Sequence, residues 1–89
     1  MTAAPSLKTR RVLVTGADGF LGRGVVAALA REGVSTLVAA DVREVPAERR
    51  LPGVTYLVQD VRDPALSQTL AAHAIDSVVH LASIVTPGK

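Results

Sequence analysis

The sequence predicts an α/β fold built on a parallel sheet, and three features of its 89 residues indicate this. Four short apolar runs, at residues 11–15, 36–40, 54–58 and 77–82, are typical of strands buried on both faces. Segments of helical periodicity separate the first run from the second and the third from the fourth. A glycine-rich turn joins the first run to the first helical segment. This alternation predicts parallel strands with right-handed crossovers.

The first half of the chain begins with a loose leader, residues 1–10, which lacks periodicity. The first strand is followed by a helix whose apolar residues recur at helical spacing and which ends at Arg31-Glu32-Gly33, a polar turn with a glycine stop. The apolar positions of this helix are Leu21, Val25, Ala28 and Leu29. Asp41 ends the second strand.

The second half, within a domain predicted over residues 11–89, opens on a proline-rich and charged segment, residues 42–53. This composition predicts a loop with one helical turn. After the third strand, Asp63 and Pro64 have the residue types of a helix N-cap and first helical position. They predict a helix with Leu66 and Leu70 facing inward, and the fourth strand follows it.

Gly16, Gly19 and Gly22 stand three residues apart where the first strand meets the first helix. The first glycine permits a tight turn, the second permits a close approach to a pyrophosphate, and the third permits helix and strand to pack. Unpaired N–H groups at the helix N-terminus favour a diphosphate. Asp41, 19 residues after Gly22, has the spacing of an acceptor for ribose hydroxyls.

These features predict the first half of a doubly wound Rossmann-type sheet, with helices on both faces and strand order 3-2-1-4. A tight turn that binds no ligand is the alternative. A P-loop is excluded, because Val25 rather than lysine follows the spacing Gly19-x-x-x-x-Gly24.

The segment Val12–Gly22 resembles the opening of extended short-chain dehydrogenase/reductases, the NAD-dependent epimerase/dehydratase family. Asp41, Asp60-Val61 and the segment 79–83 agree with the family pattern, and the similarity runs from about residue 11 to residue 87. The resemblance implies the position of each part of the cofactor. Phe20 and Leu21 would give backbone N–H groups to the pyrophosphate, Asp41 would hold the ribose, Asp60 would accept from the adenine amino group beside Val61, and Leu81, Ala82 and Ser83 would lead to the nicotinamide ribose.

Several of these residues have structural alternatives. Asp60 can start the turn before Asp63, which is itself interpreted as a cap rather than a ligand. His80 is interpreted as a core histidine with satisfied hydrogen bonds rather than a catalytic group. Ser83 can hydrogen-bond its own turn.

No catalytic residue is predicted. The family's chemistry rests on a Tyr-x-x-x-Lys pair, but Tyr56 is the only tyrosine, Asp60 stands four residues on, and the only lysines are Lys8 and Lys89. The chain ends just past a strand expected in mid-sheet, so we expect a truncated domain that is inactive alone. A metal site is not expected either, since the chain lacks cysteine and a histidine-rich cluster.

The expected cofactor is NAD rather than NADP, because Asp41 would repel a 2′-phosphate, although Arg43 could neutralise it. We expect the NAD-binding portion of an oxidoreductase similar to sugar-nucleotide epimerases and dehydratases. A non-enzymatic dinucleotide-sensing domain is the alternative. The full-length parent would bind a small-molecule substrate through its C-terminal part and form a homo-oligomer.

Composition excludes other classes of function. One phenylalanine, one tyrosine, no tryptophan and a net charge of +2 argue against a nucleic-acid surface. No apolar run approaches the roughly 20 residues of a membrane-spanning helix. The lack of cysteine fits a cytoplasmic protein.

Overall fold

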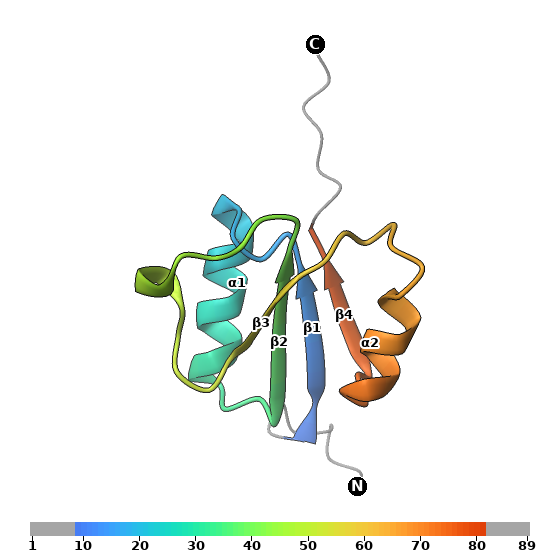
Figure 1. Cartoon of the computed structure of the whole chain (residues 1–89). Helices are drawn as coiled ribbons and strands as arrows, with labels where there is room; N and C mark the ends of the chain where they lie inside the picture. The colour runs from blue at the N-terminus through green and yellow to red at the C-terminus, as the bar shows by residue number, and fades with distance from the viewer. Residues whose placement is uncertain (1–8, 82–89) are drawn as a thin grey trace, which may run out of the picture.

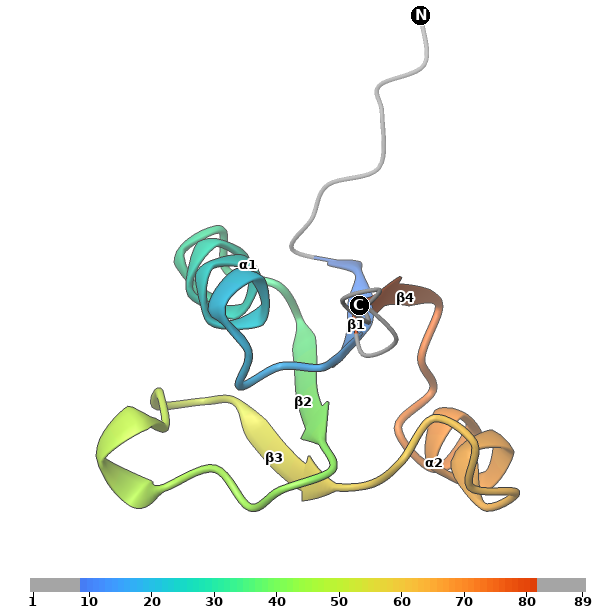
Figure 2. The same cartoon turned by 90° about the horizontal axis from the view of Figure 1, so that it is seen from above.

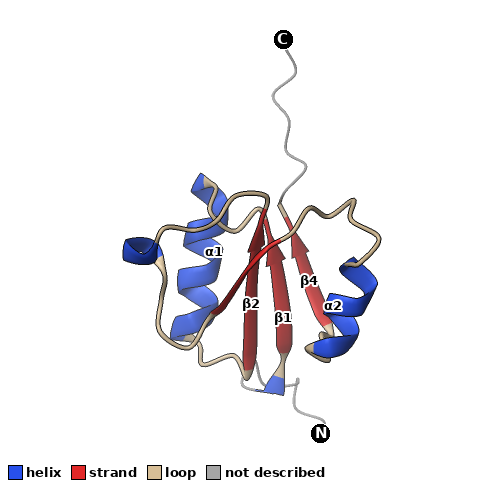
Figure 3. Cartoon of the chain, in the orientation of Figure 1, coloured by secondary structure: helices blue, strands red, loops and turns tan. Residues whose placement is uncertain are grey.

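The computed structural model describes residues 9–81, so most of the predicted leader and all residues after Leu81 lie outside the described part. Strands and helices alternate as the sequence predicts (Figures 1 and 3). The elements in chain order are β1 (Arg11–Thr15), α1 (Phe20–Arg31), β2 (Thr36–Asp41), the 3₁₀ turn η2 (Ala47–Arg49), β3 (Thr55–Val58), α2 (Leu66–Ala72) and β4 (Ser77–His80).

The four strands form one parallel sheet in the order β3-β2-β1-β4. Seen from above, α1 and α2 lie on opposite faces of this sheet (Figure 2). The predicted Rossmann-type arrangement is therefore confirmed. Because all strands are parallel, their carboxyl ends meet at a single edge, where β1 gives way to the glycine turn and β2 to residue 42.

Two small cores hold the helices against the sheet, because side chains alternate between the faces of a strand. On one face, Val12 and Val14 of β1 pack with Val26 of α1. On the other face, Leu13 packs with Val38, and Leu66, Leu70 and Ile75 from α2 and the following turn cover them. The continuous apolar run of β1 thus serves both faces, which explains why it lacks polar alternation.

Helix α1 begins at Phe20 and ends at Arg31, within the polar turn predicted to end it. Gly33 follows with a φ of 75°, a left-handed conformation that glycine adopts without a steric penalty. The predicted apolar stripe is wrong at Leu21, whose side chain is 56% exposed. Leu21 lies in the first turn of α1, and Val26 is the buried apolar side chain of the helix instead.

Three element boundaries also differ from the sequence prediction. β3 begins at Thr55 rather than residue 54, and β4 ends at His80 rather than residue 82. Leu81 still donates its N–H to the Thr15 carbonyl, and Ala82 lies outside the described residues. α2 begins at Leu66, after a turn in which the Asp63 carboxylate accepts the Ala65 N–H at 2.8 Å. Asp63 therefore caps this turn rather than the helix that begins at Leu66.

The predicted helical turn in residues 42–53 is confirmed as η2. This segment closes against β3 through the hydroxyl of Tyr56, which accepts the Leu51 N–H at 2.9 Å. The Arg50 guanidinium lies 5.6 Å from the centre of the Tyr56 ring. Tyr56 consequently has a structural role in anchoring the loop after β2. None of the helices in the described range is both long and apolar enough to cross a membrane.

Candidate functional site

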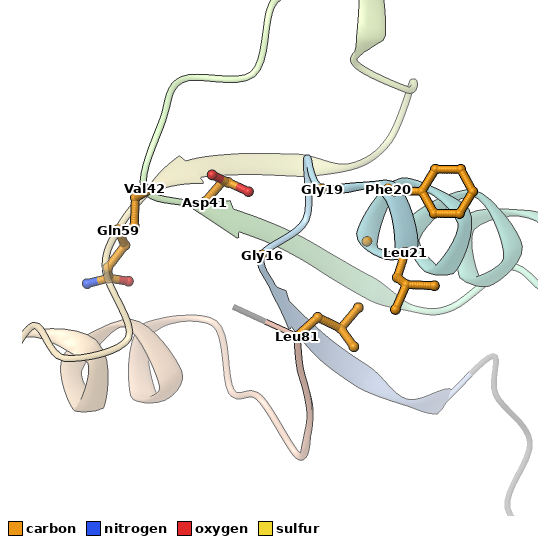
Figure 4. A pocket seen from close by; sticks show the side chains of 9 residues that line it. Gly16, Gly19, Phe20, Leu21, Asp41, Val42, Gln59 and Leu81 are labelled. Atoms are coloured by element: carbon orange, nitrogen blue, oxygen red, sulfur yellow. The ribbon is translucent and has the colours of Figure 1, made fainter. Parts of the chain in front are cut away.

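A pocket of about 360 Å³ lies at the carboxyl edge of the sheet (Figure 4). We call it the carboxyl-edge pocket. It is formed by the glycine turn, the first turn of α1 and the segments that follow β2, β3 and β4. Its lining residues are Gly16, Gly19, Phe20, Leu21, Gly22, Asp41, Val42, Gln59 and Leu81. The edge where parallel strands end is where open α/β sheets bind ligands.

The three glycines of the turn differ in what prevents a side chain there. Gly16 has a φ of 67°, which L-residues with a β-carbon rarely adopt. A β-carbon on Gly22 would lie 2.1 Å from the Gly16 carbonyl oxygen and 2.8 Å from the Ala17 backbone. A β-carbon on Gly19 would meet the same oxygen at 3.4 Å, which is ordinary contact. The fold therefore requires glycine at positions 16 and 22 but not at 19.

Helix α1 presents its N-terminus to the pocket. Gly19 occupies the N-cap position without a side chain to accept the first backbone N–H groups, and the first turn contains no acidic residue. Helix geometry leaves these N–H groups without partners inside the helix, and they carry a partial positive charge. The bare cap suits an anion that accepts several N–H groups at once.

Asp41 closes β2 on the opposite side of the pocket from α1. Its Oδ2 accepts the backbone N–H of Asp18 at 2.9 Å, and its Oδ1 accepts the Arg43 N–H at 3.2 Å. Figure 4 shows the carboxylate directed toward the glycine turn. Two backbone donors thus fix its orientation, and each oxygen retains a lone pair for another donor.

The glycine turn is also tied to the loop after β2. The carboxylate of Asp18 binds Arg49 through two hydrogen bonds, from Nε at 3.0 Å and from Nη2 at 2.6 Å. These bonds lower the pKa of Asp18 below its ordinary value, against the opposing effect of partial burial. Asp18 is therefore a charged, oriented group at neutral pH, although it does not line the carboxyl-edge pocket.

Asp60 and Val61 do not line the pocket. Arg62 binds both carboxylate oxygens of Asp60, with an Nη2–Oδ2 distance of 2.8 Å. The side-chain bonds from Arg62, followed by its backbone N–H, lower the pKa of Asp60 to about 2. The structure thus joins Asp60 to a neighbour that the sequence prediction did not consider.

Two lining residues, Val42 and Gln59, were missed from the sequence. Each stands next to a predicted aspartate, just after a strand ends, and that position is the signal that could have revealed them. Gln59 Oε1 is buried without a hydrogen-bond partner within the described residues. Such an atom is uncommon in a folded protein. It leaves a hydrogen-bond acceptor beside the pocket that a ligand donor can satisfy.

Of the three residues predicted to lead to the nicotinamide ribose, Leu81 is the one within the described range, and it lines the pocket on the side away from Asp41 (Figure 4). Ala82 and Ser83 lie outside the described residues. His80 is exposed, so its interpretation as a core residue is wrong. Its Nδ1 nevertheless lies 2.9 Å from the Thr15 hydroxyl, whose oxygen accepts the Leu81 N–H. His80 is thus paired at the strand end.

Within residues 9–81, no cluster of histidine, aspartate and glutamate side chains could hold a metal ion. The described pocket also contains no side chain suited to proton transfer apart from Asp41. The site therefore offers donors for an anion, an oriented carboxylate and apolar walls, a combination suited to binding rather than to acid–base chemistry.

Comparison with known proteins finds one matching family and several similar solved structures. A model of the "NAD dependent epimerase/dehydratase family" matches residues 12–89. A search of curated proteins finds no match. Among solved structures, UDP-glucose 4-epimerase from Thermotoga maritima is 26% identical, with a TM-score of 0.72 over 85% of this chain and 25% of that one.

Two further solved structures are similar over the same region. GalE-like L-threonine dehydrogenase from Cupriavidus necator is 27% identical, with a TM-score of 0.71 over 84% of this chain and 24% of that one. The Bordetella bronchiseptica enzyme WbmF, in complex with NAD+ and UDP, is 28% identical, with a TM-score of 0.68 over 89% and 24%. The chain thus spans about a quarter of the length of these enzymes.

Proposed function

The chain belongs to the NAD dependent epimerase/dehydratase family, and we propose that its carboxyl-edge pocket binds NAD. The observation that carries the proposal is the pairing of a bare helix N-terminus with an oriented carboxylate across one pocket. A dinucleotide needs both, because its pyrophosphate is an anion and its ribose hydroxyls are donors. The residues present fit the cofactor.

The pyrophosphate is assigned to the start of α1. Backbone N–H groups of Phe20 and Leu21 would donate to it, and Gly16 and Gly22 would hold the turn in shape. Gly19 would give the phosphates access, because a side chain there would extend into the pocket rather than disturb the fold. The exposed side chains of Phe20 and Leu21 would form part of the apolar wall.

The adenosine half is assigned to the ends of β2 and β3. Asp41 would accept the ribose hydroxyls, with Val42 and Gln59 against the base. Asp60, with Val61 beside it, would accept the adenine amino group. Arg62 uses three of the roughly four lone-pair positions of the Asp60 carboxylate, which leaves one for adenine.

The nicotinamide half is assigned to the end of β4, along Leu81, Ala82 and Ser83. When bound, NAD supplies hydride transfer to and from a substrate carbon. The parent protein would use this chemistry as an oxidoreductase similar to sugar-nucleotide epimerases and dehydratases. A substrate site and a proton donor would come from outside the described residues. We therefore expect the 89-residue chain to bind NAD weakly and to turn over no substrate.

NAD would be preferred to NADP. Each charge-assisted bond from a ribose hydroxyl to Asp41 contributes about 1.5–3 kcal/mol. A 2′-phosphate beside the same carboxylate would cost on the order of 4 kcal/mol for each pair of unit charges near a surface. Repulsion exceeds the gain from any single hydrogen bond, so Asp41 should select against the phosphate.

Titration of the ¹⁵N-labelled chain with NAD, followed by NMR, tests the binding proposal. Amide shifts should concentrate at Gly19, Phe20, Leu21, Val42 and Gln59. Gly19→Val should abolish these shifts while preserving the strands, and Gly24→Val is the matched control, since a β-carbon on Gly24 contacts nothing within 4 Å. Shifts spread evenly over the chain, or unchanged NAD affinity in Gly19→Val, would contradict the proposal.

A dinucleotide-sensing domain without catalysis is the second candidate. The carboxyl-edge pocket fits both candidates equally, because Asp41 is the only one of its described side chains suited to proton transfer. Hydride transfer by the parent protein discriminates between the two. Reduction of bound NAD by an alcohol or a sugar nucleotide supports the enzyme, and tight NAD binding without reduction supports the sensor.

A further inference from the structure

Asp18 joins the carboxyl-edge pocket to a second cavity. Its backbone N–H donates to Asp41 on the pocket side, and its carboxylate binds Arg49 on the other. The second cavity, of about 310 Å³, lies between α1 and the loop after β2. Its charged lining residues are Asp18, Arg23, Glu48 and Arg49. The Arg49 guanidinium is thus separated by one residue from the carboxylate assigned to the ribose.

Arg49 is held in this position by its own loop. Its backbone N–H donates to the Pro46 carbonyl at 2.9 Å within η2. Its side chain is 39% exposed, whereas that of Asp18 is 15% exposed. A two-point bond between a guanidinium and a carboxylate fixes both groups in one plane, and it is stronger than a single ion contact. Arg49 therefore has a defined partner and direction.

From this arrangement we infer that Asp18 sets cofactor preference by holding Arg49 away from the 2′ position of the adenosine ribose. The inference depends on the proposed NAD site and adds a residue outside it. A 2′-phosphate at Asp41 would need a nearby cation. Arg49 is linked to Asp41 through a single residue, Asp18, but its charge is already matched by the Asp18 carboxylate. A 2′-phosphate beside Asp41 therefore finds Arg49 engaged by Asp18.

Asp18 acts here as a positioning residue, because it reaches the cofactor only through Asp41 and Arg49. A purely structural role for the ion pair would alter the binding of NAD and NADP equally, since both cofactors share the glycine turn. A role in preference changes the ratio of the two affinities. That ratio separates the two roles.

The experiment measures dissociation constants of NAD and NADP for the folded chain by NMR titration. Asp18→Asn should strengthen NADP binding about tenfold, the order of one charge-assisted hydrogen bond, and leave NAD binding within about twofold. Arg49→Gln should weaken NADP binding, because Asp18 is then an unmatched charge. The variant that combines Asp18→Asn with Arg49→Gln should lose the gain in NADP affinity that Asp18→Asn produces alone.

Two controls identify the source of any change. Glu44→Gln also removes one negative charge, in the loop that carries Arg49. It removes the partner of Arg50, which stays bonded to the Val45 carbonyl, and should not alter the ratio of the two affinities. Arg43→Gln added to Asp18→Asn should keep the NADP gain if Arg49 supplies the cation.

Each remaining outcome has a defined meaning. An unchanged ratio in both Asp18→Asn and Arg49→Gln overturns the inference while the NAD site stands. If Arg43→Gln abolishes the gain in NADP affinity produced by Asp18→Asn, then Arg43 supplies the cation and the inference is overturned. Failure of the unmodified chain to bind either cofactor overturns the NAD site as well. If Asp18→Asn does not fold, the Arg49→Gln ratio decides.

Discussion

The two edges of the sheet differ in how completely their polar groups are paired within the described residues. At the amino edge, Arg11 Nε donates to the carbonyls of His73 and Ala74, and Asp76 accepts from the Arg11 N–H and the Ser77 hydroxyl. At the carboxyl edge, α1 begins without a side-chain cap, and Gln59 Oε1 has no partner among the described residues.

Under the proposed function, this difference separates structural from binding roles. The two edges consist of the same parallel strands, but the chain direction from β1 into α1 places the helix N-terminus, with its unpaired N–H groups, at the carboxyl edge. The amino edge pairs its charges internally and holds α2 in place. The carboxyl edge leaves donors and an oriented carboxylate beside a pocket, an arrangement that a ligand can complete. Substitutions at the two edges should consequently affect different properties.

The largest effect is expected at Gly22, where the carboxyl edge depends on backbone packing. Gly22→Ala forces a β-carbon into the Gly16 and Ala17 backbone, and should lower the free energy of unfolding by about 3 kcal/mol or more. Gly24→Ala, in open space, should raise it by about 0.5–1 kcal/mol. Urea denaturation followed by circular dichroism measures both. Equal stability of the two variants would refute the packing argument.

The next effect should appear mainly in cofactor binding. Asp41→Asn should weaken NAD about tenfold and strengthen NADP about tenfold, because it removes a charged acceptor and a like charge. Asp63→Asn is the control, since Asp63 also accepts a backbone N–H but lies outside the pocket. Calorimetric titration with each cofactor gives the affinities. Equal NAD and NADP affinities in the unmodified chain would already contradict the role of Asp41.

A smaller effect is expected at the amino edge, in stability alone. Arg11→Gln removes the charged donor from the His73 and Ala74 carbonyls, and should cost about 1.5 kcal/mol of unfolding free energy. Arg31→Gln, on the exposed last turn of α1, removes the same charge and should cost less than about 0.5 kcal/mol. Denaturant unfolding measures the cost. A change of NAD affinity in Arg11→Gln would break the division between the edges.

The smallest effect on stability is expected on acidification, and it should involve carboxylates at both edges of the sheet. The pKa values of Asp18, Asp60 and Asp76 are lowered by hydrogen bonds from Arg49, Arg62 and the Ser77 hydroxyl, respectively. A lowered folded-state pKa stabilises the fold above the ordinary value of 3.8 and ceases to do so as the pH falls through the folded value, about 2 for Asp60.

The melting temperature should therefore decline modestly between pH 4 and about pH 2. NMR titration of the side-chain carboxyl carbons identifies the groups responsible. Titration of Asp60 near pH 4 would show that Arg62 does not hold it in solution. Asp60→Asn should remove only the part of the decline in melting temperature that Asp60 contributes.

The sequence predicted the elements that depend on local chemistry. Apolar runs such as Val12-Leu13-Val14 predicted strands, and Gly33 predicted the end of α1, because burial on two faces and a left-handed residue each demand particular residue types. The spacing of Gly16, Gly19 and Gly22 similarly predicted the turn at the carboxyl edge. These requirements act within a few residues of one another, and for that reason a single sequence displays them.

Other features arose only from contacts between distant residues. Arg49 meets Asp18 across 31 positions, and Arg11 meets His73 across 62. Ala74 adopts a φ of 52°, a conformation that costs alanine about 1–2 kcal/mol, with its carbonyl and that of His73 accepting from Arg11. Leu21 belongs to an apolar helical pattern yet is exposed, and it lines the carboxyl-edge pocket. Residue type limits which partners a side chain can take, but the folded sheet decides which partners come within reach.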